Sequence, residues 1–269
     1  FVPALRDAAL RYTAALLLTV FGTGLVCDVL ALTIRSRRVR RVLGSIRVAL
    51  PDLMSLFLPQ RTADVLPRAP LGPVPQQGTE EFELLFQTSA HGIGLVGHCE
   101  LCFDGRTLTY GAYDPAHQRL LRTVGAGIVF SAPREPYLRW CIGTHHRRVI
   151  SYSLRLPPAQ AAQLRAELER FRQTLSPWQP EALPEDCFAG RLRRLGGVRF
   201  WRVQRGPYAT YFIPTINCVS LTNELLEKTD IGRTVMLGLK TPGAYLDLLE
   251  REYLAGNPAV TARRVYDRI

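Results

Sequence analysis

The sequence predicts an α+β protein in which an antiparallel sheet with packed helices follows an N-terminal transmembrane helix. Residues 12–34 form one long apolar run, and short alternating segments joined by turns begin near residue 79. Two later segments carry apolar residues at helical spacing. We therefore expect a membrane anchor with a basic flank over 1–41. An interfacial helix and a Pro-rich linker are expected over 42–78, and a folded domain over 79–269.

The charge of the chain is concentrated near its start. The 269 residues include 34 basic and 23 acidic side chains, a net charge of +11, and only Lys228 and Lys240 are lysines. Residues 1–78 hold ten arginines against four aspartates, which is more than half of the surplus. This distribution argues against a basic groove spread over the fold, so we expect no nucleic-acid partner. An apolar content of 47% excludes a disordered chain.

The run Tyr12–Ile34 has one charged residue, Asp28. A helix of this length crosses a hydrocarbon core of about 30 Å. A signal peptide is the main alternative, but arginines follow the run instead of a small-residue cleavage site. A buried helix of a soluble core is the other alternative.

Five arginines within residues 35–41 follow the apolar run, and we call them the arginine belt. Only Arg6 and Arg11 precede the run. The positive-inside rule then predicts a single-pass membrane protein with its C-terminal domain in the cytoplasm. Membrane lipid is the expected partner of residues 12–34 and of the Arg35–Arg41 belt.

The stretch from 42 to 78 is too polar for a second span. Residues 42–58 are apolar but interrupted by Arg47, Pro51 and Asp52, which favours an interfacial or re-entrant helix. Five prolines within residues 59–78 predict a semi-rigid linker.

A β-hairpin is predicted around Asp104-Gly105. Apolar residues alternate along 93–103 and again along 108–112. With a two-residue turn, residue 99 faces 110 and residue 95 faces 114, so both strands bury one shared face. His91 lies at the start of the first strand on that face. Further strands are expected at 126–131, 137–143 and 148–156.

The remaining elements follow from periodicity and capping residues. A helix is expected after Pro157-Pro158, with Leu164, Leu168, Phe171 and Leu175 on one face. A loop over 176–187 and strands at 198–204 and 208–213 follow. We expect one helix from Cys218 to about Lys228 and a last helix from Thr241-Pro242.

Cys218 is the candidate nucleophile, because it lies between a predicted strand and the start of a helix. A helix N-terminus favours anions, so we expect the pKa of this thiol to be depressed. His91 is the candidate base that accepts the thiol proton. Both residues also fit a structural role, as a small buried hydrophobe and a core histidine.

The order of these motifs resembles a known family. The segments Ala90–Leu95 and Tyr110–Asp114 resemble the histidine hairpin of papain-like NlpC-type cysteine hydrolases, and Asn217–Leu225 resembles their nucleophile helix. Histidine before cysteine is typical of the circularly permuted branch, which includes the YiiX- and YaeF-type peptidases and the lecithin:retinol acyltransferases. The resemblance covers about residues 84–230. It implies a papain-like permuted fold and a thiol hydrolase or acyltransferase that works through a thioester.

That family also uses a third polar residue that orients the histidine. Asp114 and Tyr110 both fall on the inward face by the alternation described above. Asp114 lies closer to His91, so we expect it to take this role, although the family more often has His, Asn or Glu here. Glu100 projects to the other face. The Cys218 backbone N–H is the expected oxyanion donor.

Metal and cofactor sites are not predicted. The segment His98–Cys102 has zinc-ligand residue types, but Cys99 and Cys102 point to opposite faces of a strand. The six cysteines lack a regular disulfide spacing, which favours free thiols in a reducing compartment.

Two other functions stay open beside the hydrolase, whose substrate would be a peptide or a lipid acyl group. One is a non-catalytic subunit of a membrane complex, with the basic tail at Arg263-Arg264 and Tyr266 as a docking segment. The other is binding to anionic lipid or nucleic acid, which would depend steeply on salt concentration.

Overall fold

The computed structural model describes residues 81–88, 97–119, 123–179, 184–213, 215–229 and 240–267. The predicted anchor at 12–34, the arginine belt, the linker and His91 lie outside these residues. Within the described ranges, no helix is both long and apolar enough to cross a bilayer.

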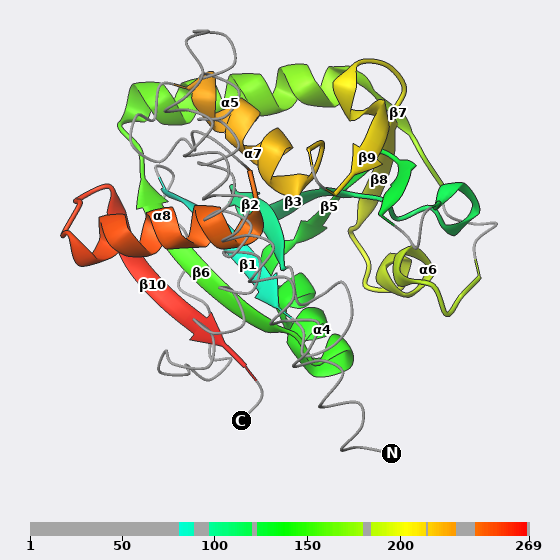
Figure 1. Cartoon of the computed structure of the whole chain (residues 1–269), viewed down its shortest axis with the longest axis horizontal. Coiled ribbons are helices and arrows are strands. Elements are labelled where there is room, and N and C mark those ends of the chain that lie inside the picture. The colour runs from blue at the N-terminus through cyan, green and yellow to red at the C-terminus, as the bar shows by residue number, and fades with distance from the viewer. Residues whose placement is uncertain are drawn as a thin grey trace, which may run out of the picture. The chain divides into compact units, whose positions relative to one another are not determined.

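The described chain has an α+β fold built on one large antiparallel sheet (Figure 1). The strands of this sheet follow the order β10-β6-β1-β2-β3-β5-β8-β7, and every neighbouring pair is antiparallel. Their bounds are β1 (Glu81–Thr88), β2 (His98–Phe103), β3 (Arg106–Gly111), β5 (Ile128–Pro133), β6 (Arg148–Arg155), β7 (Leu175–Pro177), β8 (Arg199–Val203) and β10 (Val260–Tyr266). Two further strands, β4 (Val124–Ala126) and β9 (Thr210–Phe212), pair separately.

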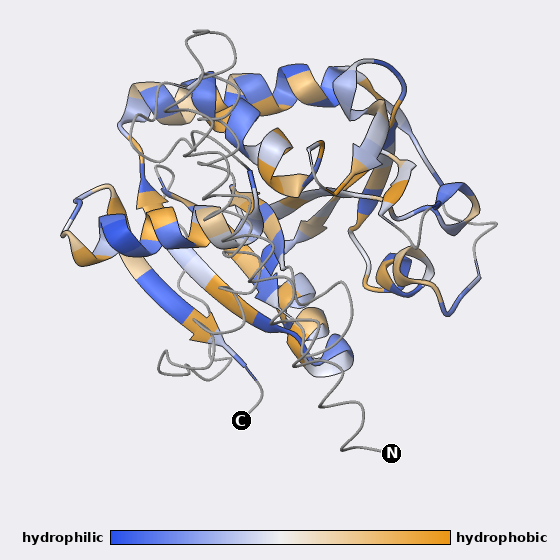
Figure 2. Ribbon diagram, in the orientation of Figure 1, coloured by the Kyte–Doolittle hydropathy of each residue, from blue (hydrophilic) through white to orange (hydrophobic). Residues whose placement is uncertain are grey.

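Helices cover both faces of the sheet (Figure 1). Their bounds are α4 (Arg134–His145), α5 (Pro158–Gln173), α6 (Phe188–Arg193), α7 (Cys218–Glu227) and α8 (Pro242–Leu254), with short 3-10 turns η3 (Pro115–His117) and η5 (Pro207–Ala209). α5, α7 and α8 pack on one face, and α4 and α6 pack on the other. In Figure 2, hydrophobic and hydrophilic residues alternate along α5, as expected for a helix with one buried side.

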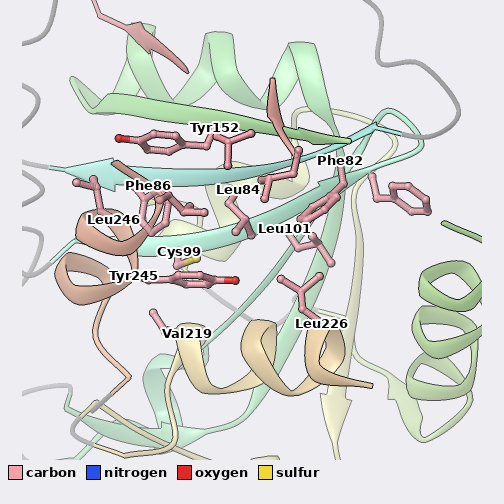
Figure 3. Close-up of a cluster of buried hydrophobic side chains, with 14 of the residues drawn as sticks. Phe82, Leu84, Phe86, Cys99, Leu101, Tyr152, Val219, Leu226, Tyr245 and Leu246 are labelled. Carbon is pink, nitrogen blue, oxygen red and sulfur yellow. The ribbon is translucent and has the colours of Figure 1, made fainter. Parts of the chain in front are cut away.

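The central strand β1 contributes to both cores. Phe82, Leu84 and Phe86 point toward α7 and α8, whereas Leu85 belongs to the cluster around α4. Figure 3 shows the first cluster, in which Tyr245 of α8 lies against the strands. The rings of Phe86 and Tyr245 meet edge to face at 6.0 Å between centroids. The polar residues Glu83 and Gln87 alternate with the apolar ones along β1 and are buried as well, so both faces of this strand are covered.

The predicted hairpin is present. Asp104 and Gly105 form the turn with positive φ values of 48° and 69°, and Leu101 pairs with Leu108 in the expected register. Most later expectations are also confirmed. Strands form near 128–133, 148–155, 199–203 and 210–212, and helices begin at Pro158, Cys218 and Pro242.

The strand expected at 137–143 is wrong, because these residues form part of α4. Tyr137, Leu138, Cys141 and Ile142 are buried together, a spacing that fits one side of a helix rather than a strand. Pro133 precedes the first turn, and Glu135 in that turn complements the helix dipole.

Residues 260–266, which include the basic segment Arg263-Arg264 and Tyr266, are part of the folded sheet. They form β10 at the edge of the sheet beside β6. Arg263 pairs with Glu250 of α8, and its guanidinium lies 4.8 Å from the Tyr253 ring centroid. Arginine is therefore part of an edge strand here, where charge discourages pairing with another chain.

Candidate functional site

Cys218 is the first residue of α7, and its side chain is 2% exposed. α7 packs against β2 and β3, near the middle of the sheet. The structure therefore confirms that the cysteine stands at a helix N-terminus.

The residue before Cys218 fixes this helix start. Asn217 is the N-cap: its side-chain oxygen accepts from the Ser220 N–H at 3.0 Å, and the Ser220 hydroxyl accepts from the Asn217 N–H at 2.8 Å. The Asn217 side-chain amide also donates to the carbonyls of Ile213 and Lys240, both at 2.8 Å. This capping box and its two tethers hold Cys218 in a defined position.

The Cys218 sulfur accepts a hydrogen bond from the Cys99 N–H at 3.4 Å. The pairing of β2 with β3 extends from the turn only to Leu101–Leu108, so Cys99 lies beyond the paired section. The Cys218 sulfur thus accepts from a backbone N–H of β2 at a point where β2 is no longer paired with β3.

The pKa of Cys218 is raised to about 11, chiefly by burial. The N–H groups of Cys99, Val219 and Cys218 oppose this effect, and the nearby Glu100 carboxyl adds to it. The expectation of a depressed pKa is therefore wrong. Loss of solvation outweighs the helix N-terminus, so the thiol is protonated at neutral pH unless a base removes its proton.

Three tyrosines surround the thiol. Tyr211 hydrogen-bonds to Cys218, and burial raises its pKa. Tyr110 and Tyr113 are close enough for the cysteine to raise their pKa values as well, after the larger effect of burial. All three hydroxyls therefore stay protonated and able to donate. Tyr110 was expected on the inward face from the sequence, whereas Tyr113 and Tyr211 were not predicted to lie near the thiol.

Of the predicted partners of Cys218, His91 lies outside the described residues, and Asp114 has other contacts. β3 ends at Gly111, so the alternation used to place Asp114 stops before it. Its carboxylate accepts from the Ala116 N–H at 3.1 Å, binds His117 Nδ1 at 2.7 Å and forms an ion pair with Arg202. Among the described histidines, Asp114 thus contacts His117.

A second histidine, His98, immediately precedes Cys99, whose N–H donates to the Cys218 sulfur. Its Nε2 is 2.6 Å from Thr109 Oγ1 and 3.0 Å from the Tyr113 hydroxyl, and 3.9 Å from Glu100 Oε1. Burial and the neighbouring Arg147 lower the pKa of His98 to about 3, so its imidazole is neutral. The sequence analysis weighed His98 only as a metal ligand.

The face assignment of the β2 residues is confirmed. Cys99 belongs to the cluster with α7 and α8, whereas Cys102 belongs to the cluster with α4. Glu100 accepts from Tyr137 of α4, so it too points away from α7. Among the described residues, no group of three His, Cys, Asp or Glu side chains is arranged to hold a metal ion.

Comparison of the chain with family models, with curated proteins and with solved structures found no significant match.

Proposed function

We propose that this protein is a thiol hydrolase or acyltransferase that forms a thioester on Cys218, with a circularly permuted papain-like domain. One observation carries the proposal: at a helix N-terminus, the Cys218 sulfur accepts a hydrogen bond from the Cys99 N–H at 3.4 Å, and the N–H groups of Val219 and Cys218 also favour the thiolate. Such a set of donors stabilises a thiolate and the oxyanion that forms beside it.

The chemistry requires a base, because the pKa of the thiol is about 11. A histidine accepts the thiol proton, the sulfur attacks a carbonyl carbon, and the same histidine protonates the leaving amine or alcohol. Water or a second alcohol or amine then cleaves the thioester. His91 is the proposed base and Asp114 its proposed orienting residue. The Tyr211 hydroxyl, which hydrogen-bonds to the thiol, is a further donor for the oxyanion.

The proposed substrate is an amide or ester, either a peptide or a lipid acyl group. A lipid substrate agrees with the proposed single-pass anchor at residues 12–34 and with a cytoplasmic catalytic domain. Deletion of residues 1–41 should release the protein from membranes into the soluble fraction after alkaline carbonate washing. A deletion that leaves the protein in the membrane pellet would overturn the anchor.

A non-catalytic subunit of a membrane complex is the second candidate. The 2% exposure of Cys218 and the raised pKa of its thiol favour it, because both describe an unreactive buried cysteine.

Labelling with an iodoacetamide probe, followed by mass spectrometry of each cysteine, separates the two candidates. Cys187 is the matched control, since it is the described cysteine that is only partly buried. A hydrolase should label faster at Cys218 than at Cys187, and His91→Ala should abolish the difference. Labelling confined to Cys187 would favour the non-catalytic subunit.

A further inference from the structure

A groove of about 470 Å³ lies between α5 and the sheet, near the Asp104–Gly105 turn. Its lining comes from β2, β3, β5, β7, β8 and α5. The volume falls within the range of about 300–1,000 Å³ that is usual for small-molecule sites.

The floor of the groove is one row of side chains across four strands. Leu101 pairs with Leu108, Leu108 with Ser131, and Ser131 with Arg199, so the four side chains share a face. Three steps between neighbouring strands span about 14 Å. The row therefore changes from two leucines at one end, through a hydroxyl, to a guanidinium at the other.

The walls of the groove are apolar over most of this length. Leu168 and Phe171 of α5 line it from the helix side, and Trp201 of β8 lies two residues from Arg199 on the same side of the strand. A hydrocarbon chain placed along the row would contact side chains only. Because the floor is a sheet face and not an edge, it offers no free backbone groups to a peptide.

The two arginines at the polar end have no acidic partner among the residues that the structure describes. Arg106 donates to Ser131 Oγ at 2.9 Å and to the Gly197 carbonyl at 2.8 Å, and both acceptors are neutral. Arg199 is close enough to contribute to lowering the pKa of Arg106, after the larger effect of burial. Within the described part of the chain, neither Arg106 nor Arg199 forms an ion pair.

The two acidic residues of the groove are already neutralised. Asp104 accepts from Arg165 at 2.9 Å and 3.0 Å, and Glu169 accepts from Arg172 at 2.8 Å and 2.6 Å. The positive charge of Arg106 and Arg199 is thus unbalanced at the end of an apolar channel, which favours an anionic head group.

We propose that this groove binds a long-chain fatty acid, with its carboxylate on Arg106 and Arg199 and its hydrocarbon chain along Leu108 and Leu101 beneath α5. The guanidinium fork of Arg199 matches a carboxylate in geometry and charge. Arg106 adds its Nη1 donor, because its Nε and Nη2 already donate to Ser131 and Gly197. This site does not depend on the thiol chemistry proposed for Cys218.

Photocrosslinking of the full chain with a dodecanoic acid that carries a diazirine at its distal carbon tests the site. We expect adducts on α5 and on the strands beneath it. Arg199→Glu should weaken labelling about tenfold, the effect of losing one charge-assisted contact. Arg205→Glu is the matched control, because Arg205 is exposed, lies just beyond β8 and does not line the groove. It should label like the parent protein.

The neutral alcohol with the same diazirine chain provides the second arm. We expect the alcohol to label the groove about tenfold less than the acid. Equal labelling by acid and alcohol, or adducts outside the groove, would overturn the proposal. So would competition by a soluble acidic peptide but not by dodecanoate, which would identify a protein partner instead. Labelling that survives Cys218→Ala keeps this result separate from the proposed enzyme function.

Discussion

Tyr137 donates a hydrogen bond of 2.6 Å to Glu100 Oε1 in the layer between α4 and the sheet. The side-chain amide of Gln87 donates to the Tyr137 hydroxyl at 2.8 Å, and Arg147 donates to Gln87 at 3.0 Å. A buried carboxyl is thereby connected to a guanidinium through two neutral side chains. In this chain of hydrogen bonds, Glu100 has no direct contact with the charge of Arg147. The protonation of Glu100 should therefore make the stability of the fold depend on pH.

Glu100→Gln should remove the loss of folding stability that Glu100 causes as pH rises. Burial raises the pKa of Glu100 from 4.5 to about 7, so the folded state holds a proton that the unfolded state releases in this window. The parent protein should therefore lose up to about 3 kcal/mol from this residue as pH rises from 4.5 to 7, and the loss should then level off. Denaturant unfolding at about pH 5 and about pH 8 measures the difference between the two proteins.

The buried His98 changes the stability in the opposite direction as pH rises. The effect of Glu100 is therefore measured as the difference between the parent protein and Glu100→Gln at each pH. Burial lowers its pKa from 6.5 to about 3, and its contribution to stability is lost as pH falls through that range. The two slopes oppose each other between about pH 4.5 and 6.5 in the parent protein. If Glu100→Gln and the parent show the same pH profile, the carboxyl is charged in the fold and the assignment is wrong.

Arg134→Met should destabilise the protein by about 3–5 kcal/mol, because it leaves the Glu83 carboxylate buried without its partner. Arg134 pairs with Glu83 through two nitrogens, and the Ser151 hydroxyl donates to the same carboxylate at 3.1 Å. Adding Glu83→Leu should recover much of the loss. A double variant less stable than Arg134→Met in urea unfolding would contradict a desolvation cost.

Gly127→Ala should cost about 1–3 kcal/mol or more, since a Cβ there would stand 1.9 Å from the Tyr208 carbonyl oxygen. Gly127 joins β4 to β5, and its N–H donates to the Ala209 carbonyl at 2.9 Å. Gly143→Ala is the matched control, because a Cβ on this exposed helical glycine meets nothing within 4 Å. It should raise the thermal midpoint slightly.

Asn217→Ala should both destabilise the fold and slow alkylation of Cys218. It removes an N-cap and two tethers, at a cost of about 2 kcal/mol, and lets the helix start shift relative to Cys99. Thr241→Ala removes the side-chain cap of α8, where Thr241 accepts from the Ala244 N–H at 3.1 Å. It should cost about 1 kcal/mol and leave the alkylation rate unchanged. Equal rates in both variants would show that Asn217 supports folding alone.

Local patterns predicted much of this fold, because turn and cap residues act over short distances. Asp104-Gly105 determined the hairpin register, and Thr241-Pro242 marked the start of α8. The α4 segment was wrongly predicted as a strand, because Tyr137, Trp140 and Ile142 are residue types common in strands. Its buried helical face is defined by packing against the sheet.

The candidate site was predictable in part. Cys218 was identified from the strand-to-helix boundary, and that boundary is where the structure has it, but the N-cap role of Asn217 was not predicted. The pKa of the thiol was not predictable, because it depends on how deeply α7 is buried against β2. The contacts of Asp114 with His117 and Arg202 join a local turn at 114–117 to β8, and alternation within one strand carries no information about them.

β10 has a consequence for how the chain acquires its fold during synthesis. It pairs along β6, whose residues Ile150, Tyr152 and Leu154 belong to the core. Until residues 260–266 leave the ribosome, β6 is an unprotected edge beside β1 and open to pairing with other nascent chains. Deletion of residues 260–266 should therefore yield an aggregating product that quality-control proteases degrade.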